Sequence, residues 1–441
     1  MWVLLFIVLL PSLALANSEM LYVRQAGACA YNGNGTAYTC AASNGAAGAY
    51  ITSDNVLYAS TDTVGRVDPG DTLYVCGTHT ADQMEVYQDG TASLPIDIDG
   101  NCPNDTGSIA PTSNNFALYL AGSYLKVHGL DISRGDTGTV QINPNAAGNV
   151  TLTAAVELYD NRIHDGLHDT ALVFGYGREV SIHDNSIYNG KGAGIYHNGK
   201  NARIARNKIY NIDTELGGDS VQLSGEMDGS VIEENWSDRS SGIDLKACWT
   251  TSSTTDAGFV ILSGNTCIGN ERFTLFSGMY NETNILVTGN YFYAGRNGLW
   301  CAVAAGRQCD LIGNTVINPK ERAVQTGGTG TGDRVIGNTL IGSETPTAIG
   351  ISLGNPVAGV QARNNTIVGF TTGIEKQGGS GSTDSHNTFH NISGNYVTNN
   401  GTPGTPGVGS RFENPSYPSS HWGGGWIIRH AIFSTVKGAS W

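Results

Sequence analysis

Five ionisable residues gather in a short stretch of an otherwise weakly charged sequence. They are Asp219, Asp244, Lys246, Glu271 and Arg272. Carboxylates and cations of this kind can transfer protons to or from a bound substrate and can neutralise a charge that develops during a reaction. Two carboxylates held at a fixed separation are also what the hydrolysis of a glycosidic bond requires. The elements that hold these residues therefore decide which chemistry is available.

A repeated phrase shows what positions these residues. From about residue 156, an apolar residue, a gap, Asn, a variable residue and a second apolar or aromatic residue recur, with 22 to 30 residues between successive asparagines. A repeat of this length is typical of a solenoid. The asparagines of the phrase are Asn161, Asn185, Asn207, Asn235, Asn265, Asn290, Asn314, Asn338, Asn365 and Asn387.

The segments between these phrases indicate strands. Short runs such as Thr170-Ala-Leu-Val-Phe, Gly194-Ile-Tyr-His and Gly242-Ile-Asp-Leu alternate with a period of about two and are bounded by Gly, Asn or Asp. Helical spacing with caps is absent from the sequence pattern. We predict an all-β fold, a single-stranded right-handed parallel β-helix, in which each Asn occupies the same bend and bonds to the coils above and below.

These repeats resemble the pectate-lyase-like superfamily of secreted parallel β-helix proteins, over about residues 118–400. The phrase Asp68-Pro-Gly-Asp is similar to one found near the first coil of such proteins. We divide the sequence into a signal peptide at 1–16, an N-terminal cap with early irregular coils at 17–117, the repeats at 118–400, and a C-terminal tail or cap at 401–441. Caps are expected because the open ends of a solenoid expose its apolar interior and unpaired strand edges.

Composition limits the partners and the compartment. The 441 residues include 60 Gly and only 14% charged residues, which fits one elongated domain of repeated bends. The net charge of −14 argues against nucleic acid and against an anionic membrane as partners. Met1 to Ala16 is uncharged and apolar and ends in small residues, so we expect export and a secreted monomer, extracellular or periplasmic.

Export makes disulfides the expected state of the cysteines. The eight cysteines fall into four local pairs, and none has the C-x-x-C spacing of a zinc site. The neighbours are Cys29 with Cys40, Cys76 with Cys102, Cys248 with Cys267, and Cys301 with Cys309.

One outer face of the solenoid is the expected binding surface, since the resemblance implies a substrate groove along the sheet that contains the Gly-Ile runs. Taking each Ile as inward, alternation predicts an outward column of Tyr196, Gln222, Asp244, Thr274, Trp300, Gln325, Gly350 and Glu375. A second column would hold Asn198, Ser224, Lys246, Phe276 and Ala302. Tyr196, Phe276 and Trp300 are suited to stacking on sugar rings, with Gln222 between them, so a polysaccharide is the expected substrate.

The order Asp-x-Lys followed by Arg one coil later is similar to the alginate lyase and chondroitinase B family. That resemblance implies β-elimination in a uronic-acid-containing polysaccharide, with Lys246, Arg272 and Asp244 catalytic and Lys246 as the base. It also implies Ca²⁺, held by Asp219, Asp244 and Glu271. The sequence departs from the family pattern, because Phe276-Ser-Gly stands where that family has Arg-His-Gly.

Other functions stay open. Asp219 and Asp244 on neighbouring coils could serve a glycoside hydrolase, although the Gly-His phrase of polygalacturonases is missing. A third set, His164, Asp165, His168, Asp169, His183, Asp184 and His197, offers the residue types of mannuronan epimerases without their Asp-Pro-His-Glu phrase, and we expect His197 to point inward. Lys246 could also be a plain surface partner of Asp244. A glycan-binding or adhesin β-helix without catalysis would use the aromatic face alone.

Overall fold

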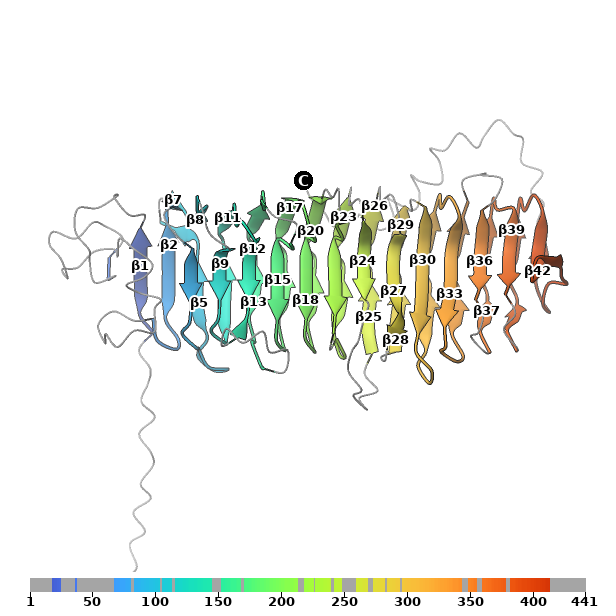
Figure 1. The fold of residues 1–441 in the computed structure, drawn as a ribbon, viewed down its shortest axis with the longest axis horizontal. Helices are drawn as coiled ribbons and strands as arrows, with labels where there is room; N and C mark the ends of the chain where they lie inside the picture. The colour runs from blue at the N-terminus through green and yellow to red at the C-terminus, as the bar shows by residue number, and fades with distance from the viewer. Residues whose placement is uncertain are drawn as a thin grey trace, which may run out of the picture.

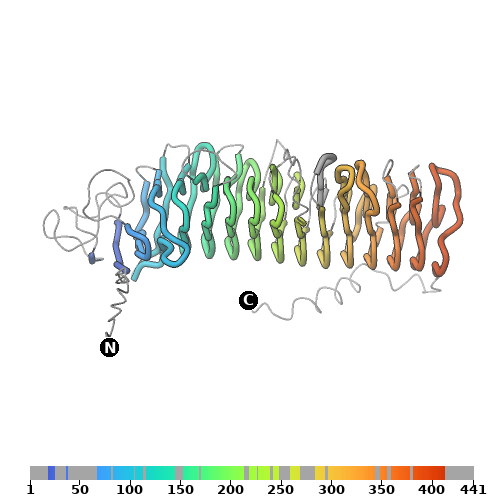
Figure 2. The backbone as a smooth tube through the Cα atoms, turned by 90° about the horizontal axis from the view of Figure 1, so that it is seen from below, coloured from blue at the N-terminus to red at the C-terminus, as the bar shows by residue number. Residues whose placement is uncertain are grey.

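The computed structural model describes residues 18–24, 36–37 and 67–412, the last range with short gaps, of which 248–258 is the longest. The described chain is an elongated rod of stacked coils without any helix (Figures 1 and 2). Each coil of the rod supplies one strand to each of three long sheets, here called A, B and C. The all-β, parallel β-helix expected from the repeat is therefore confirmed. No stretch of the described chain forms an apolar helix of membrane-spanning length.

Sheet A has 14 strands, all parallel to their neighbours. They are β1 (Met20–Arg24), β2 (Thr72–Cys76), β5 (Ile96–Asp99), β10 (Leu125–His128), β13 (Glu157–Tyr159), β16 (Ser181–His183), β19 (Arg203–Ala205), β22 (Val231–Glu233), β25 (Phe259–Ser263), β28 (Asn284–Thr288), β31 (Cys309–Ile312), β34 (Arg334–Ile336), β37 (Gln361–Arg363) and β40 (Thr383–Ser385).

Sheet B also has 14 strands and follows sheet A around each coil. They are β3 (Thr78–His79), β8 (Ser108–Ile109), β11 (Asp131–Ser133), β14 (Arg162–His164), β17 (Ser186–Gly190), β20 (Lys208–Ile212), β23 (Trp236–Asp238), β26 (Thr266–Ile268), β29 (Tyr291–Tyr293), β32 (Thr315–Ile317), β35 (Thr339–Ile341), β38 (Thr366–Val368), β41 (Thr388–His390) and β44 (Arg411–Phe412).

Sheet C completes the coil, and its last pair, β42 with β43, is antiparallel. Its strands are β4 (Met84–Val86), β9 (Phe116–Leu120), β12 (Gly138–Ile142), β15 (Val173–Tyr176), β18 (Ile195–Asn198), β21 (Val221–Ser224), β24 (Ile243–Ala247), β27 (Phe273–Asn281), β30 (Asn297–Val303), β33 (Arg322–Gly328), β36 (Ile349–Leu353), β39 (Thr372–Lys376), β42 (Asn395–Asn399) and β43 (Thr402–Pro403).

The core is a continuous apolar column inside the rod. Strand residues alternate between this interior and the outer face, so one coil buries Ile182 from sheet A, Ile187 from sheet B and Ile195 from sheet C. The next coil places Ile204, Ile209 and Val221 against them through the parallel register. This stacking leaves the outer faces of the sheets free to display polar and aromatic side chains.

The repeated asparagines form a ladder at the bend between sheets A and B. Asn185 is buried, and its Nδ2 donates to the carbonyl oxygens of Leu158 at 2.8 Å and His183 at 2.9 Å, and to Oδ1 of Asn207 at 3.0 Å. Its own Oδ1 accepts from the backbone amide of Asn161 at 3.0 Å. Equivalent bonds join each ladder Asn to the next as far as Asn387, so the predicted role of the Asn column is confirmed.

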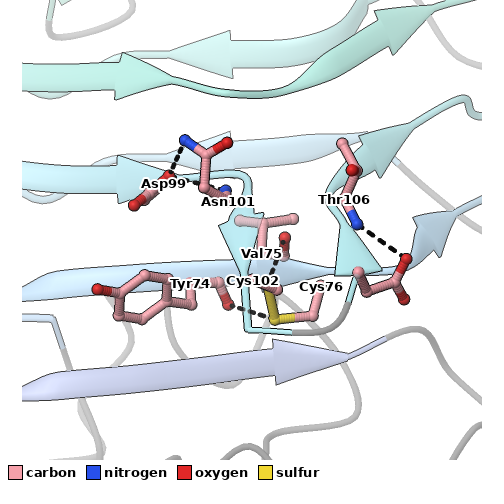
Figure 3. Close-up of a disulfide and its surroundings, with 8 residues drawn as sticks. Tyr74, Val75, Cys76, Asp99, Asn101, Cys102 and Thr106 are labelled. Atoms are coloured by element: carbon pink, nitrogen blue, oxygen red, sulfur yellow. Dashed lines mark hydrogen bonds between the residues drawn. A yellow bond between two sulfur atoms is a disulfide. The ribbon is translucent and has the colours of Figure 1, made fainter.

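Two of the four expected disulfides lie in the described chain. Cys76–Cys102 ties β2 to the hairpin of β6 (Asn101–Cys102) and β7 (Asp105–Thr106), near the N-terminal end of the rod (Figure 3). Cys301–Cys309 links β30 to β31. Cys267 is instead a free thiol buried in the core, so its expected pairing with Cys248 is wrong.

The remaining expectations about the ends of the chain fall outside the described residues. Cys29, Cys40 and Cys248 belong to this group, as do the signal peptide at 1–16 and residues 413–441 of the tail. Within the early segment assigned to the cap, β1 and β2 already pair in parallel as the first strands of sheet A.

A buried carboxyl in the C-terminal half predicts a pH-dependent stability. Asp333 is fully buried, and burial raises its pKa to about 7, despite the 3.0 Å bond that its Oδ1 accepts from the Cys309 amide. An unfolded aspartate ionises near pH 4, so this residue should lower the stability of the fold progressively between about pH 4 and pH 7. We expect Asp333→Asn to raise the free energy of unfolding by about 1–2 kcal/mol at pH 8 and by almost nothing at pH 4. Denaturant titrations at the two pH values measure this difference, and an equal gain at both would contradict it.

Candidate functional site

The strand register of sheet C aligns one residue of each coil in a column along the rod, which we call the sheet C column. Ser352 and Thr398 in it are buried, and the other members whose side chains are described are partly exposed. Neighbouring members are paired residues on adjacent coils, about 4.8 Å apart. In order, they are Glu85, Tyr119, Gln141, Phe174, Tyr196, Gln222, Lys246, Phe276, Trp300, Gln325, Ser352, Glu375 and Thr398. The strands that hold its centre follow one another along the rod from β12 to β30, with β21 between β18 and β24 (Figure 1).

The column differs from the one predicted by alternation at the coil of β24. Leu245, not Ile243, occupies the interior position that pairs with Val221, and this moves the outward position to Lys246. Asp244 was expected to face outward and instead is fully buried, which is a wrong prediction. The same change of register puts Phe276 in place of Thr274 in the next coil. In a later coil, Ser352 takes the place expected for Gly350.

A pocket of about 290 Å³ lies on sheet C at the coils of β15 to β24. Its floor is made by four consecutive residues of the column, Phe174, Tyr196, Gln222 and Lys246. The turns that enter these strands supply its rim. The lining residues from the turns are Thr170, Ala171, Lys191, Gly192, Ala193, Gly218 and Asp219.

An ion pair between neighbouring coils lies at one end of this pocket. Nζ of Lys246 is 3.0 Å from Oδ2 of Asp219, whose side chain is only 5% exposed, while that of Lys246 is 25% exposed. Oδ1 of Asp219 accepts a 2.9 Å hydrogen bond from the backbone amide of Ile243, which fixes the carboxylate. The fixed Asp219 carboxylate thus holds the Lys246 ammonium in place, and the exposed part of the Lys246 side chain remains accessible to a ligand. Its partner is Asp219, not the Asp244 considered from the sequence.

Asp244 belongs to a polar chain inside the coil. Its Oδ1 accepts a 2.6 Å hydrogen bond from the hydroxyl of Ser237, and that hydroxyl is 2.6 Å from the hydroxyl of Ser220. Burial raises the pKa of the nearby Cys267 thiol, and the Asp244 charge adds to this effect. A carboxylate in this position cannot reach a substrate on the outer face. The pair of surface acids that a hydrolase would need from Asp219 and Asp244 is therefore not formed.

The predicted Ca²⁺ ligands do not fit a shared cation in the described chain. Asp219 is engaged by Lys246 and by a backbone amide, and Asp244 lies in the core. Glu271 and Arg272 lie outside the described residues. No cluster of three or more His, Cys, Asp or Glu side chains suited to a metal ion occurs in the part of the chain that is described.

Aromatic side chains make the other end of the pocket. The rings of Phe174 and Tyr196 stack with centroids 4.9 Å apart and an interplanar angle of 10°. Tyr176 meets Phe174 edge-on at 5.0 Å, and burial raises the pKa of the Tyr176 hydroxyl. Rings of this kind provide an apolar platform with polar tips, which suits a sugar.

The predicted substrate-binding residues are placed as follows. Tyr196 and Gln222 line the pocket, and Trp300 is a partly exposed member of the same column two coils beyond Lys246. The backbone of Phe276 lies in the column between Lys246 and Trp300. Phe174 and Lys191 also line the pocket and were not predicted. Phe174 could have been found from its run Thr170-Ala-Leu-Val-Phe, which alternates like the others, whereas Lys191 comes from a turn without a repeating signal.

The described members of the histidine set do not converge on one site, and His168 and Asp169 lie outside the described residues. His197 points into the core, and burial lowers its pKa to about 4, so its predicted inward position is confirmed. His164 and His183 lie on the outer faces of sheets B and A and each lies between two carboxylates. Their ring nitrogens are 2.7–3.0 Å from Asp131 and Asp165, and from Glu157 and Asp184, respectively. These are hydrogen-bonded contacts on other sheets, away from the pocket.

Comparisons with known proteins agree with this architecture. Residues 170–340 match the family model described as right handed beta helix region. Among solved structures, the complex of XylC with xylose is 11% identical, covering 91% of this chain and 87% of that one, with a TM-score of 0.53. The Dettilon tailspike protein is 16% identical with a TM-score of 0.50. The match covers 67% of this chain but only 60% of the tailspike chain.

A third similar structure is a mannuronic acid specific polysaccharide family 6 lyase from human gut microbiota. It is 14% identical over 79% of this chain and 78% of that one, with a TM-score of 0.40. No curated protein matches the sequence. The register of the three sheets and the matched region agree with the expected architecture. The chain is a right-handed parallel β-helix protein.

Proposed function

We propose that this chain is a secreted polysaccharide lyase that cleaves a uronic-acid-containing glycan at the sheet C pocket. The observation that supports this function is the Lys246–Asp219 pair facing the stacked rings of Phe174 and Tyr196 across one hollow. A cation beside an apolar platform suits a sugar that carries a carboxylate.

The reaction requires three actions on the sugar. A base removes the proton at C5, the electron pair forms the double bond between C4 and C5, and the bond from C4 to the glycosidic oxygen breaks while that oxygen gains a proton. The C6 carboxylate takes up negative charge as the C5 proton leaves. An ammonium next to that carboxylate stabilises the transition state more than the ground state.

The geometry suggests how the pocket residues share these actions. Because Lys246 already has a carboxylate 3.0 Å away, we assign it the role of the cation that holds the C6 carboxylate, instead of the base expected from the sequence. Tyr196 lines the same pocket, and its hydroxyl is the group we assign to proton transfer. The two residues are two coils apart, about 10 Å between their Cα atoms, which leaves room for one sugar ring.

The function is tested by incubating the purified protein with polymers that contain uronic acids and with neutral glycans. Ultraviolet absorbance from unsaturated ends reports β-elimination. Reducing ends without that absorbance would show hydrolysis and reject the lyase. Binding to a glycan without any cleavage would favour the adhesin-like alternative.

Removal of the Tyr196 hydroxyl gives a specific expectation. Tyr196→Phe keeps the ring that stacks on Phe174 and removes the proton carrier, so kcat should fall about 100-fold while KM changes little. Tyr210→Phe is the matched control, because Tyr210 also stacks in a ladder on the outer face, on sheet B. Unchanged kcat in Tyr196→Phe would remove this residue from the mechanism.

A further inference from the structure

We infer that the glycan recognised by this chain carries isolated acidic sugars separated by uncharged ones, and is not a polymer with a carboxylate on every sugar. This inference rests on the proposed binding of a glycan along sheet C. It follows from how charge is distributed along the sheet C column.

Among the residues that make up the sheet C column, positive charge is confined to the pocket. Lys246 is the only cation among the residues that make up the sheet C column, and Lys191 lines the same pocket from a turn. The other charged members of the column are acids, Glu85 near the N-terminal end and Glu375 near the C-terminal end. A glycan lying over the column therefore meets a cation of the column itself only at the pocket.

The part of the column before the pocket is aromatic and neutral. Tyr119, Gln141 and Phe174 follow one another on adjacent coils. Tyr87 packs against Tyr119 with ring centroids 6.0 Å apart, and Nδ2 of Asn143 donates a 3.2 Å hydrogen bond to the Tyr119 hydroxyl. Rings and amides of this kind bind the faces and hydroxyl groups of uncharged sugars.

A polymer charged on every sugar would be poorly matched to this surface. A pyranose unit is about as long as the spacing of about 4.8 Å between coils, so successive carboxylates would approach successive residues of the column. Beyond the pocket, they would meet rings, amides and finally Glu85, and the column itself offers no cation there to offset their desolvation. The net charge of −14 adds a repulsion that grows with the number of charges on the ligand.

Three hexasaccharides that differ in charge spacing test the inference on the full-length protein. They are a hexagalacturonate with a carboxylate on every sugar, a hyaluronan hexasaccharide with one on every second sugar, and neutral xylohexaose. Calorimetric titration should give a Kd for the hyaluronan hexamer at least tenfold lower than that for hexagalacturonate. The neutral hexamer should bind at least tenfold more weakly than the hyaluronan hexamer.

Two variants in the column and one control on sheet B connect the result to the column. Tyr119→Ala should weaken binding of the hyaluronan hexamer about fivefold and leave binding of free glucuronate unchanged, whereas Tyr210→Ala on sheet B should change neither. Glu85→Gln should improve binding of hexagalacturonate relative to the hyaluronan hexamer, because it removes an opposing charge.

The outcomes separate the two claims. Tighter binding of hexagalacturonate than of the hyaluronan hexamer would overturn this inference and leave the proposed function standing. No binding of either acidic hexamer, or equal binding of the neutral one, would reject the acidic-glycan function itself.

Discussion

Lys246→Ala should reduce cleavage of an acidic glycan about a thousandfold, the largest effect we expect at the pocket. The ammonium is the charge that offsets the carboxylate of the bound sugar as the C5 proton leaves, and its position is fixed by Asp219. Loss of this cation should lower kcat and also weaken substrate binding. The initial rate at which ultraviolet absorbance increases, followed over a range of substrate concentrations, measures both kcat and the strength of substrate binding.

The variant also leaves the largely buried Asp219 without its lysine, so its fold needs a separate check. The double variant Asp219→Asn with Lys246→Met removes both charges together and should remain folded yet inactive. Lys126→Ala is the control, because Lys126 also pairs with a carboxylate, Glu157 at 3.8 Å, on the outer face of sheet A. Full activity in a folded Lys246 variant would exclude this residue from the reaction.

Asn290→Ala should lower the free energy of unfolding by about 3–5 kcal/mol, the largest stability effect we expect from a single substitution. Nδ2 of Asn290 donates to the carbonyl oxygens of Leu262 and Thr288 and to Oδ1 of Asn314, at 2.9–3.1 Å. Its Oδ1 accepts two bonds of 2.9 Å from Asn265. Alanine leaves these buried groups without partners in a bend that water cannot enter freely. Denaturant titration monitored by circular dichroism measures the change.

An asparagine outside the ladder provides the comparison. Asn395 lies exposed on β42, so Asn395→Ala should change the free energy of unfolding by less than about 0.5 kcal/mol. Similar losses for Asn290 and Asn395 would show that the buried ladder does not hold the coils together.

The fold could be read from the sequence because its signal repeats. Every coil needs the same amide at the same bend, so ten asparagines report one structural requirement, and all ten lie in the ladder. The strand segments between them follow from alternation. The pairing of Cys267 was not predictable in this way, because nearness along the sequence does not tell which face of a strand a thiol occupies, and Cys267 faces the core.

The candidate site was harder to predict, for a physical reason that is visible at β24. The Gly-Ile phrase suggested that Ile243 is the interior residue, but Leu245 takes that place, and the outward position moves by two residues. Asp244 consequently lies in the core and not on the outer face, and Lys246, expected in a second outward column, takes its place in the pocket. Tyr196 and Gln222 come from coils without this change, and they line the pocket as expected. Lys191 comes from a turn, where no periodic pattern applies.

The asparagine ladder also has a consequence for how such a chain can change over time. Each ladder residue makes the same bonds to the coil before it and the coil after it, as Asn185 does with Asn161 and Asn207. Duplication or loss of a whole repeat in the gene would therefore join two ends that already match. The rod can grow or shorten by whole coils while the pocket, made by only four neighbouring coils, stays intact.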